Sequence, residues 1–166
     1  MRRVKTFICV ALIILTLQAC SFVGETDYAM FEERFNKANK EIQLVNSNVI
    51  SENFEKSTKY NCFFDAENGG KYMMTIYEKN DSNIITSCTL CVLSSINLDT
   101  NSVKELFCSM IFAYSQTDRE ISEKIFNELK LNEENTYKRN GNTTAEFDNL
   151  KINIIVNGAG TAITIC

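Results

Sequence analysis

Histidine, tryptophan and proline are all absent from this chain of 166 residues. Histidine is the side chain whose unperturbed pKa lies nearest neutral pH, and it is the commonest protein ligand for transition metals. Its absence excludes Ser-His-Asp catalysis, Cys-His catalysis and histidine-based zinc sites. A glycine-rich phosphate loop is also lacking, since the cluster Asn157-Gly158-Ala159-Gly160 lies between two strand-like runs and predicts a turn. We therefore expect neither a cofactor nor a metal.

The N-terminus has no apolar run long enough to cross a bilayer. Three basic residues lie within the first five positions, and an apolar stretch of 11 residues follows from Phe7 to Leu17. A helix that crosses the bilayer core needs about 20 apolar residues. A basic start followed by a short apolar run is typical of a signal peptide. The sequence therefore predicts export and no transmembrane anchor.

The tetrapeptide Leu17-Gln18-Ala19-Cys20 ends this apolar run. It resembles the lipobox of bacterial lipoproteins, in which an aliphatic residue stands three positions before a cysteine and a small residue directly before it. Gln18 departs from the small residue that is usual at its position, and the resemblance covers only the first 20 residues. It implies that residues 1–19 are a signal peptide, and that the Cys20 thiol carries a diacylglyceryl group after cleavage.

A diacylglyceryl group would supply two acyl chains, and two chains anchor a protein stably where one myristoyl-length chain binds only reversibly. The expected partner is therefore the lipid bilayer, and the expected location is the bacterial cell envelope, facing outside the cytoplasm. Ser21 follows Cys20, which leaves an outer membrane or a Gram-positive cell surface open. The alternative is an ordinary secretory signal that ends in Leu-Gln-Ala and releases a soluble protein.

Removal of residues 1–19 leaves 147 residues, enough for one domain with a hydrophobic core. The net charge then changes from -4 to -7, because three basic residues are lost. Nucleic-acid binding depends on Lys and Arg displacing counterions, so this acidic chain is not expected to bind nucleic acid. We predict a lipidated tether over residues 20–25 and a single globular domain over residues 26–166.

Helical periodicity marks the first part of this domain and its centre. The first segment has apolar residues three or four positions apart, which predicts an amphipathic helix packed on the core: Tyr28, Phe31, Phe35, Ala38, Ile42 and Val45. Two capping-box patterns, Ser102–Glu105 and Thr117–Glu120, predict the starts of two further helices within residues 102–131.

Strand patterns lie on both sides of the central helices. Three β-rich runs, Tyr60–Phe64, Lys71–Glu78 and Asn83–Leu93, are separated by polar turns and predict an antiparallel meander. In the third run the more apolar face, expected to meet the helices, holds Ile84, Thr86, Cys88, Leu90 and Val92. The Asn-Gly pair at 140–141 predicts a hairpin turn. Alternation from residue 150 onwards predicts the last strands.

This order of elements predicts an α+β fold. We expect an antiparallel β-sheet of about five strands, with an N-terminal helix and a central helix pair packed on one face.

Five cysteines follow Cys20: Cys62, Cys88, Cys91, Cys108 and Cys166. If Cys20 carries lipid, the number is odd, and at least one thiol stays free, pairs between chains or is buried. If Cys20 is unmodified, six cysteines allow three bridges in 15 connectivities. The predicted faces suggest bridges from the third strand to the helix of Cys108 and to the last strand. Each would contribute about 2–4 kcal/mol.

Cys88 and Cys91 form a Cys-x-x-Cys motif, which raises thiol–disulfide exchange as a function. Redox motifs of this kind place the first cysteine at a helix N-terminus, where its pKa is lowered. Here the motif lies in a β-branched, apolar run, and residues three apart on a strand are about 10 Å apart. That distance exceeds the roughly 7 Å limit between the Cα atoms of a disulfide, so we expect no bond between the two.

The favoured function is a non-enzymatic module that binds a protein or another surface ligand through its sheet or loops. Two alternatives remain open: thiol–disulfide exchange through Cys88 and Cys91, and an inhibitor-like surface module. A glycosidase pair of carboxylates drawn from Asp65, Glu67 or Glu78 is disfavoured, because abundant carboxylates are typical of a solvated acidic surface.

Overall fold

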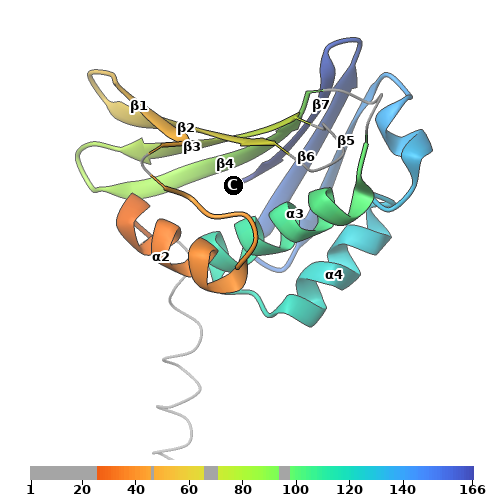
Figure 1. The fold of residues 1–166 in the computed structure, drawn as a ribbon, viewed down its shortest axis with the longest axis horizontal. Helices are drawn as coiled ribbons and strands as arrows, with labels where there is room; N and C mark the ends of the chain where they lie inside the picture. The colour runs from red at the N-terminus through yellow and green to blue at the C-terminus, as the bar shows by residue number, and fades with distance from the viewer. Residues whose placement is uncertain (1–25, 46, 66–70, 94–97) are drawn as a thin grey trace, which may run out of the picture.

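The computed structural model describes residues 26–45, 47–65, 71–93 and 98–166. Within these residues the chain forms one antiparallel sheet and three α-helices, and all three helices lie on one side of the sheet (Figure 1). The predicted α+β class is confirmed. The predicted signal peptide, the lipidation site Cys20 and the tether up to residue 25 lie outside the described residues.

The sheet has seven strands, against the five or so predicted. They are β1 (Val49–Asn53), β2 (Ser57–Asp65), β3 (Lys71–Lys79), β4 (Ile84–Val92), β5 (Gly141–Phe147), β6 (Leu150–Asn157) and β7 (Gly160–Ile165). The order is β1-β2-β3-β4-β7-β6-β5, so two meanders meet where β7 pairs with β4. The additional strands are β1 and β5, which form the two edges of the sheet. Few apolar residues mark these two segments in the sequence.

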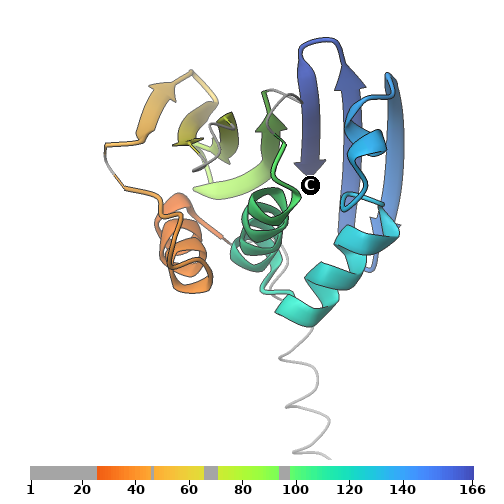
Figure 2. The ribbon, with the colours of Figure 1, turned by 45° about the vertical axis from the view of Figure 1, so that its right-hand side comes forward.

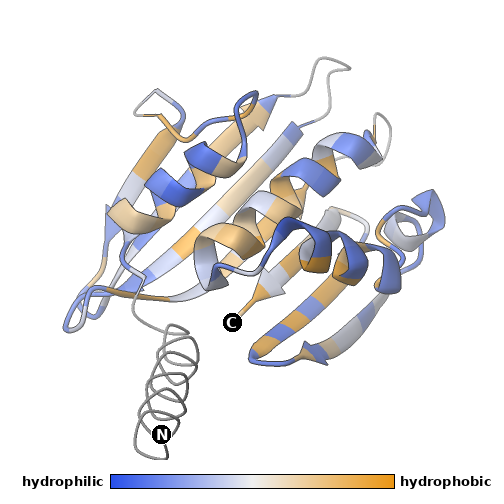
Figure 3. Cartoon of the chain, turned by 90° about the horizontal axis from the view of Figure 1, so that it is seen from below, coloured by the Kyte–Doolittle hydropathy of each residue, from blue (hydrophilic) through white to orange (hydrophobic). Residues whose placement is uncertain are grey.

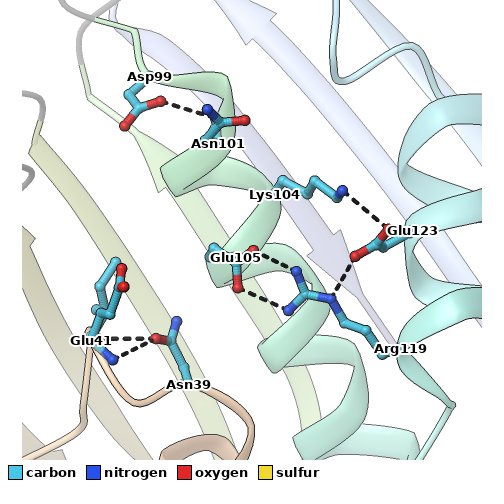
Figure 4. A network of polar contacts seen from close by, with 9 residues as sticks. Asn39, Glu41, Asp99, Asn101, Lys104, Glu105, Arg119 and Glu123 are labelled. Atoms are coloured by element: carbon cyan, nitrogen blue, oxygen red, sulfur yellow. Dashed lines mark hydrogen bonds and ion pairs between the residues drawn. The ribbon is translucent and has the colours of Figure 1, made fainter.

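The helices are α2 (Tyr28–Ala38), α3 (Thr100–Ser115) and α4 (Arg119–Glu128). The predicted first helix was too long, since α2 ends at Ala38 and not near Val45. The cause is Asn39, whose side-chain oxygen accepts hydrogen bonds from the backbone N–H groups of Glu41 (3.2 Å) and Ile42 (2.9 Å) (Figure 4). An asparagine side chain that binds the backbone in this way competes with helix continuation.

Both predicted capping boxes were wrong in detail. With Ser102 as its N-cap, helix α3 would begin at residue 103. It begins three residues earlier, at Thr100, because Asp99 is the N-cap and its side chain accepts a hydrogen bond from the Asn101 N–H at 3.0 Å. Ser102 itself donates to the Asp99 carboxylate at 2.7 Å. At α4 the side chain of Asp118 makes no cap hydrogen bond. Thr117 is hydrogen-bonded to the Ser115 hydroxyl at 2.7 Å.

The last strands confirm one predicted turn and correct another. Gly141 begins β5, and the hairpin between β5 and β6 turns at Asp148, which adopts a left-handed φ of 50°. The Asn157–Gly160 segment does form the turn between β6 and β7. Gly160 has a φ of 145°, and a Cβ on it would collide with the carbonyl oxygen of Val92. Glycine therefore lets β7 approach the end of β4.

The hydrophobic core lies between the helices and one face of the sheet, here called the core face (Figures 2 and 3). On β3 and β4 this face holds Tyr72, Met74, Ile76, Ile85, Cys88, Leu90 and Val92, all buried. Fully burying a side chain of this size contributes about 1.5–3 kcal/mol. Helix α3 supplies the centre of the helical layer, with α2 and α4 packed on either side of it.

The predicted core face of β4 is correct from Cys88 to Val92 and wrong before it. A register shift between Tyr77 and Glu78 on β3 reverses the alternation, so Ile85 is buried whereas Thr86 is exposed. An irregularity of this type adds a residue to one strand and sends the preceding side chains to the opposite face.

Ion pairs connect α3 to α4 on the outside of the helical layer. Arg119 on α4 binds both carboxylate oxygens of Glu105 on α3, at 2.9 and 2.5 Å, and Glu123 at 2.8 Å (Figure 4). Lys104 of α3 completes the group at 3.1 Å from Glu123. A bidentate arginine–carboxylate pair fixes geometry better than a lone lysine pair, so this group sets the packing of the two helices.

Candidate functional site

The face of the sheet opposite the core, here called the open face, carries no helix among the described residues (Figure 1). Five apolar side chains form one continuous row across five neighbouring strands, each paired with the next in the strand register: Phe63, Met73, Cys91, Ala162 and Ile155. We call this row the apolar stripe. Phe63 is 44% exposed and Ile155 41% exposed. Met73, Cys91 and Ala162 between them are intermediate in exposure. Large contiguous exposed apolar patches mark interaction surfaces in soluble proteins.

A row of polar residues runs beside the apolar stripe, two positions along each strand. It consists of Asn61, Thr75, Thr89, Thr164, Asn153 and Thr144, again in register. Thr89 and Thr164 share a hydrogen bond of 2.9 Å, and Thr75 donates to Asn61 at 3.3 Å. Because these hydroxyl and amide groups satisfy one another, the row stabilises the sheet surface beside the stripe.

Three pairs of oppositely charged residues lie across neighbouring strands on the open face. Lys59 lies 3.5 Å from Glu52, Asp65 is the register partner of Lys71, and Glu146 is the register partner of Lys151. These three cross-strand pairs bring no net charge. An acidic chain therefore presents one large surface that is close to neutral.

A hollow of about 180 Å³ lies at one end of the apolar stripe. Its apolar lining includes Cys91, Leu93, Ile155 and Ala162, from β4, β6 and β7 and the residue after β4. Three small residues, Ala159, Gly160 and Ala162, also line this depression. The other end of the stripe, on β2 and β3, carries the bulkier Phe63 and Met73.

All five described cysteines are free. Burial raises the pKa of Cys62 and of Cys108 to about 12 and that of the fully buried Cys88 well above its ordinary value. Cys91 is half-buried, and burial raises its pKa as well. The suggested bridges are not formed. Cys91 is the register partner of Ala162. Cys166 lies four residues beyond Ala162, so about 14 Å along the strand separates Cys166 from Cys91.

The Cys-x-x-Cys motif lies within β4, as the sequence predicts. Cys88 belongs to the core face and has no exposed surface, whereas Cys91 belongs to the open face. The nucleophile in disulfide exchange is an accessible thiolate of lowered pKa. A buried thiol and a half-buried thiol of raised pKa on opposite faces do not provide one.

The carboxylates considered for hydrolysis do not come together. Asp65 and Glu78 lie at opposite ends of the β2–β3 hairpin, seven residues or about 24 Å apart along β3, whereas glycosidase carboxyl groups are about 5–9.5 Å apart. Glu78 instead accepts the Tyr28 N–H (2.9 Å) and the Tyr60 hydroxyl (2.8 Å), which fixes the start of α2 to the sheet. Glu67 lies outside the described residues.

A hollow of about 990 Å³ is lined by residues of β5 and β6 and of the segment that follows α4. Its apolar lining residues include Phe147, Ile154 and Val156, and its charged lining residues include Lys130 and Glu133.

Among the described residues there is no group of three or more Cys, Asp or Glu placed to hold a metal ion. In the same part of the chain no helix is long and apolar enough to cross a membrane.

Sequence reasoning placed Cys91 on the face away from the helices but did not find the apolar stripe. The stripe depends on β7 pairing with β4, and that pairing joins residues some 70 positions apart. Alternation within each strand was the available signal. Comparison with protein families, with curated proteins and with solved structures finds no match for this chain.

Proposed function

We propose that this chain is a lipid-anchored, non-enzymatic interaction module of a bacterial cell envelope, tethered through Cys20 and binding a protein through the open face of its sheet. The observation that carries the proposal is the apolar stripe, which is partly exposed, with Phe63 and Ile155 at its two ends the most exposed. Support for the anchor is the Leu17–Cys20 motif after a short apolar run.

The position of Thr26 supports a tether that leaves the stripe accessible. The Thr26 carbonyl accepts the Ile85 N–H at 2.8 Å, at the start of β4, and its hydroxyl donates to the Tyr114 carbonyl at 3.3 Å, near the end of α3. Cys91 lies six residues, or about 20 Å, further along β4. Lipid at Cys20, six residues before Thr26, would therefore attach the domain at the end where β4 begins, whereas the stripe crosses the other half of that strand.

Absence of enzymatic function is supported by the chemistry of the described side chains. The buried thiols are held protonated, and the carboxylates on β2 and β3 are either paired or used in packing. Thiol–disulfide exchange predicts rapid alkylation of Cys88 and Cys91 at pH 6. We expect both to react more slowly than a model thiol, and a fast-reacting Cys88 would contradict the proposal.

Fractionation of the expressing bacterium tests the anchor. The wild-type chain is expected in the membrane fraction, and a Cys20→Ser variant is expected to be lost from it. Ser21→Ala is the matched control, since it changes the neighbouring residue and keeps the thiol. Equal membrane association of the wild-type chain and Cys20→Ser would overturn the lipid anchor.

A further inference from the structure

The edge strand β5 presents unpaired backbone groups beside a hollow. We infer that it takes up an extended peptide segment of another protein, which pairs antiparallel to β5 as an additional strand. The inference goes beyond the proposed function, because it concerns the edge of the sheet and not the open face. In strand addition of this kind, backbone hydrogen bonds give affinity and pockets for alternate side chains give specificity.

The hydrogen bonds of β6 show which groups of β5 are unpaired. Lys151 on β6 exchanges both of its backbone hydrogen bonds with Cys166, at 3.0 and 3.1 Å, so its N–H and C=O groups face away from β5. Its register partner on β5 is Glu146. Bonded and non-bonded pairs alternate along an antiparallel ladder, so the backbone groups of Asn142, Thr144 and Glu146 point away from β6. No other backbone group of the described residues binds them.

This edge lacks the features that normally protect a sheet edge. Natural edge strands are often very short, carry lysine or proline, or contain bulges. Strand β5 has seven residues, GNTTAEF, without lysine, arginine or proline. Its register with β6 runs without a shift. The opposite edge, β1, is shorter, with five residues. Strand β5, the outermost strand in Figure 2, is therefore open to the addition of a further strand.

The hollow of about 990 Å³, here called the edge hollow, lies beside β5 on the side of the core face. It is lined by Thr143, Ala145 and Phe147 of β5 and by the buried Ile154 and Val156 of β6. Residues directly opposite each other on paired strands share one face of the sheet. An added strand therefore directs the side chains opposite Thr143 and Ala145 towards the edge hollow. We expect large apolar side chains at these two positions of the peptide.

A second copy of this chain fits the edge hollow less well than such a peptide. The two-fold register that pairs all seven residues of two β5 strands is centred on Thr144. It places Ala145 of one copy opposite Thr143 of the other. Only small side chains would then enter the edge hollow at the two positions where a peptide can supply large ones.

Charges at the two ends of β5 set the direction of the peptide. Lys138 and Arg139 line the edge hollow just before β5 begins. Glu146 and Asp148 lie at the other end of the strand. Opposite charges across neighbouring strands stabilise a sheet. An antiparallel peptide with a basic residue near its N-terminus and an acidic residue at its C-terminus places each of them beside the opposite charge.

The test uses the full-length chain in detergent micelles and a fluorescein-labelled synthetic peptide of sequence TKLTLTVE. In the inferred register its lysine lies opposite Glu146, its two leucines opposite Ala145 and Thr143, and its glutamate beside Arg139. Fluorescence anisotropy should show saturable binding with a Kd below about 1 mM, the weak end of the affinity scale.

N-methylated peptides distinguish strand addition from apolar adsorption. Methyl groups on the backbone nitrogens of the second and fourth residues replace N–H groups that face β5, and should raise the Kd by about tenfold or more. The matched control carries its methyl groups on the third and fifth residues, whose nitrogens face away from β5. Its Kd should change by less than about threefold.

Thr144→Pro tests the edge from the side of the protein. Proline removes an N–H group that points away from β6, so the ladder between β5 and β6 is kept. The Kd should rise by about tenfold or more. The matched control is Ser51→Pro on β1. Because the Phe63 N–H donates to the Asn48 carbonyl at 2.9 Å, alternation along the ladder points the Ser51 N–H away from β2, and the Kd should not change.

Hydrogen exchange of the wild-type chain is the second measurement. The amides of Asn142, Thr144 and Glu146 should exchange more slowly when the peptide is bound, whereas the Ser51 amide should not change. This result does not depend on the folding of any variant.

Absence of saturable binding at about 1 mM peptide would overturn the inference. Unchanged exchange at the three amides of β5 would do the same. A dimer of the free chain that Thr144→Pro dissociates would also overturn it, because a second copy would then occupy β5. Membrane association through Cys20 and binding through the open face do not depend on these results, so the proposed function is tested separately.

Discussion

The two faces of this sheet are built by the same strands and differ in what covers them. Met73 and Met74 are neighbours on β3, yet Met74 is fully buried under the helices and Met73 belongs to the apolar stripe. Cys88 and Cys91 divide in the same way on β4. Apolar side chains therefore serve stability on one face and, in our proposal, recognition on the other. Substitutions at matched positions separate these two uses.

The largest difference is expected between the two methionines. Met74→Ala leaves a cavity in the core and should lower the free energy of unfolding by about 2–5 kcal/mol. Met73→Ala removes a partly buried side chain of the open face, and should cost less than about 1 kcal/mol. Urea unfolding at low protein concentration measures both. Equal losses in the free energy of unfolding for Met73→Ala and Met74→Ala would mean that the two faces are equally buried.

A carboxylate on each face gives the next comparison. Glu78 on the helical side accepts two hydrogen bonds, from Tyr28 and Tyr60. A buried hydrogen bond to a charged group contributes about 1.5–3 kcal/mol. Both bonds here are only partly buried, so Glu78→Ala should cost about 2 kcal/mol in total in urea unfolding. Glu146→Ala on the open face removes a carboxylate that stands opposite Lys151 in the strand register and makes no ion pair among the described residues, so it should cost at most about 1 kcal/mol. A larger loss of unfolding free energy in Glu146→Ala than in Glu78→Ala would contradict the structural role given to Glu78.

The buried thiols predict how stability depends on pH. Burial raises the pKa of Cys62 from 9.0 to about 12, so the folded state keeps a proton that the unfolded state loses. The stabilisation is complete below pH 9 and is lost as the pH rises from 9 towards 12. At pH 10 the loss is about 1.4 kcal/mol for this thiol. Urea unfolding measures the decrease in the free energy of unfolding between pH 7 and pH 10. This decrease should be smaller in Cys62→Ala than in the wild type, and equal decreases would show that the pKa of Cys62 is not raised.

The smallest expected effect concerns the ion pairs on the outer side of the helices. Arg119→Ala removes the contacts to Glu105 and Glu123 and should cost about 0.5–1 kcal/mol, less in high salt. The control is Lys138→Ala, which removes an isolated pair with Glu134 at 3.0 Å and should cost less than about 0.5 kcal/mol. Thermal unfolding at two salt concentrations measures both. Insensitivity of Arg119→Ala to salt would show that packing, not charge, joins α3 to α4.

Periodicity in the sequence predicted most of the fold and little of the site. The strong alternation of β4 and the spacing of apolar residues in α3 were sufficient to place these elements. Edge strand β5 was missed because its sequence, GNTTAEF, has apolar residues only near its end. The end of α2 was also missed. The Asn39 side chain accepts hydrogen bonds from the backbone and ends the helix, although the spacing of apolar residues would continue it.

The site depends on pairing between distant segments, which one sequence does not reveal. Ala162 contributes to the apolar stripe only because β7 lies beside β4. The register shift between β3 and β4 likewise decides which of Ile85 and Thr86 faces the core. Neither the strand order nor the shift follows from the pattern within a single strand.

The mass of the mature chain, extracted from membranes of the expressing bacterium, tests the central claim most directly. The account predicts a polypeptide that begins at Cys20 and carries a diacylglyceryl group on its sulfur. A mature chain found in the culture medium, with Cys20 as a free thiol or in a disulfide, would contradict it.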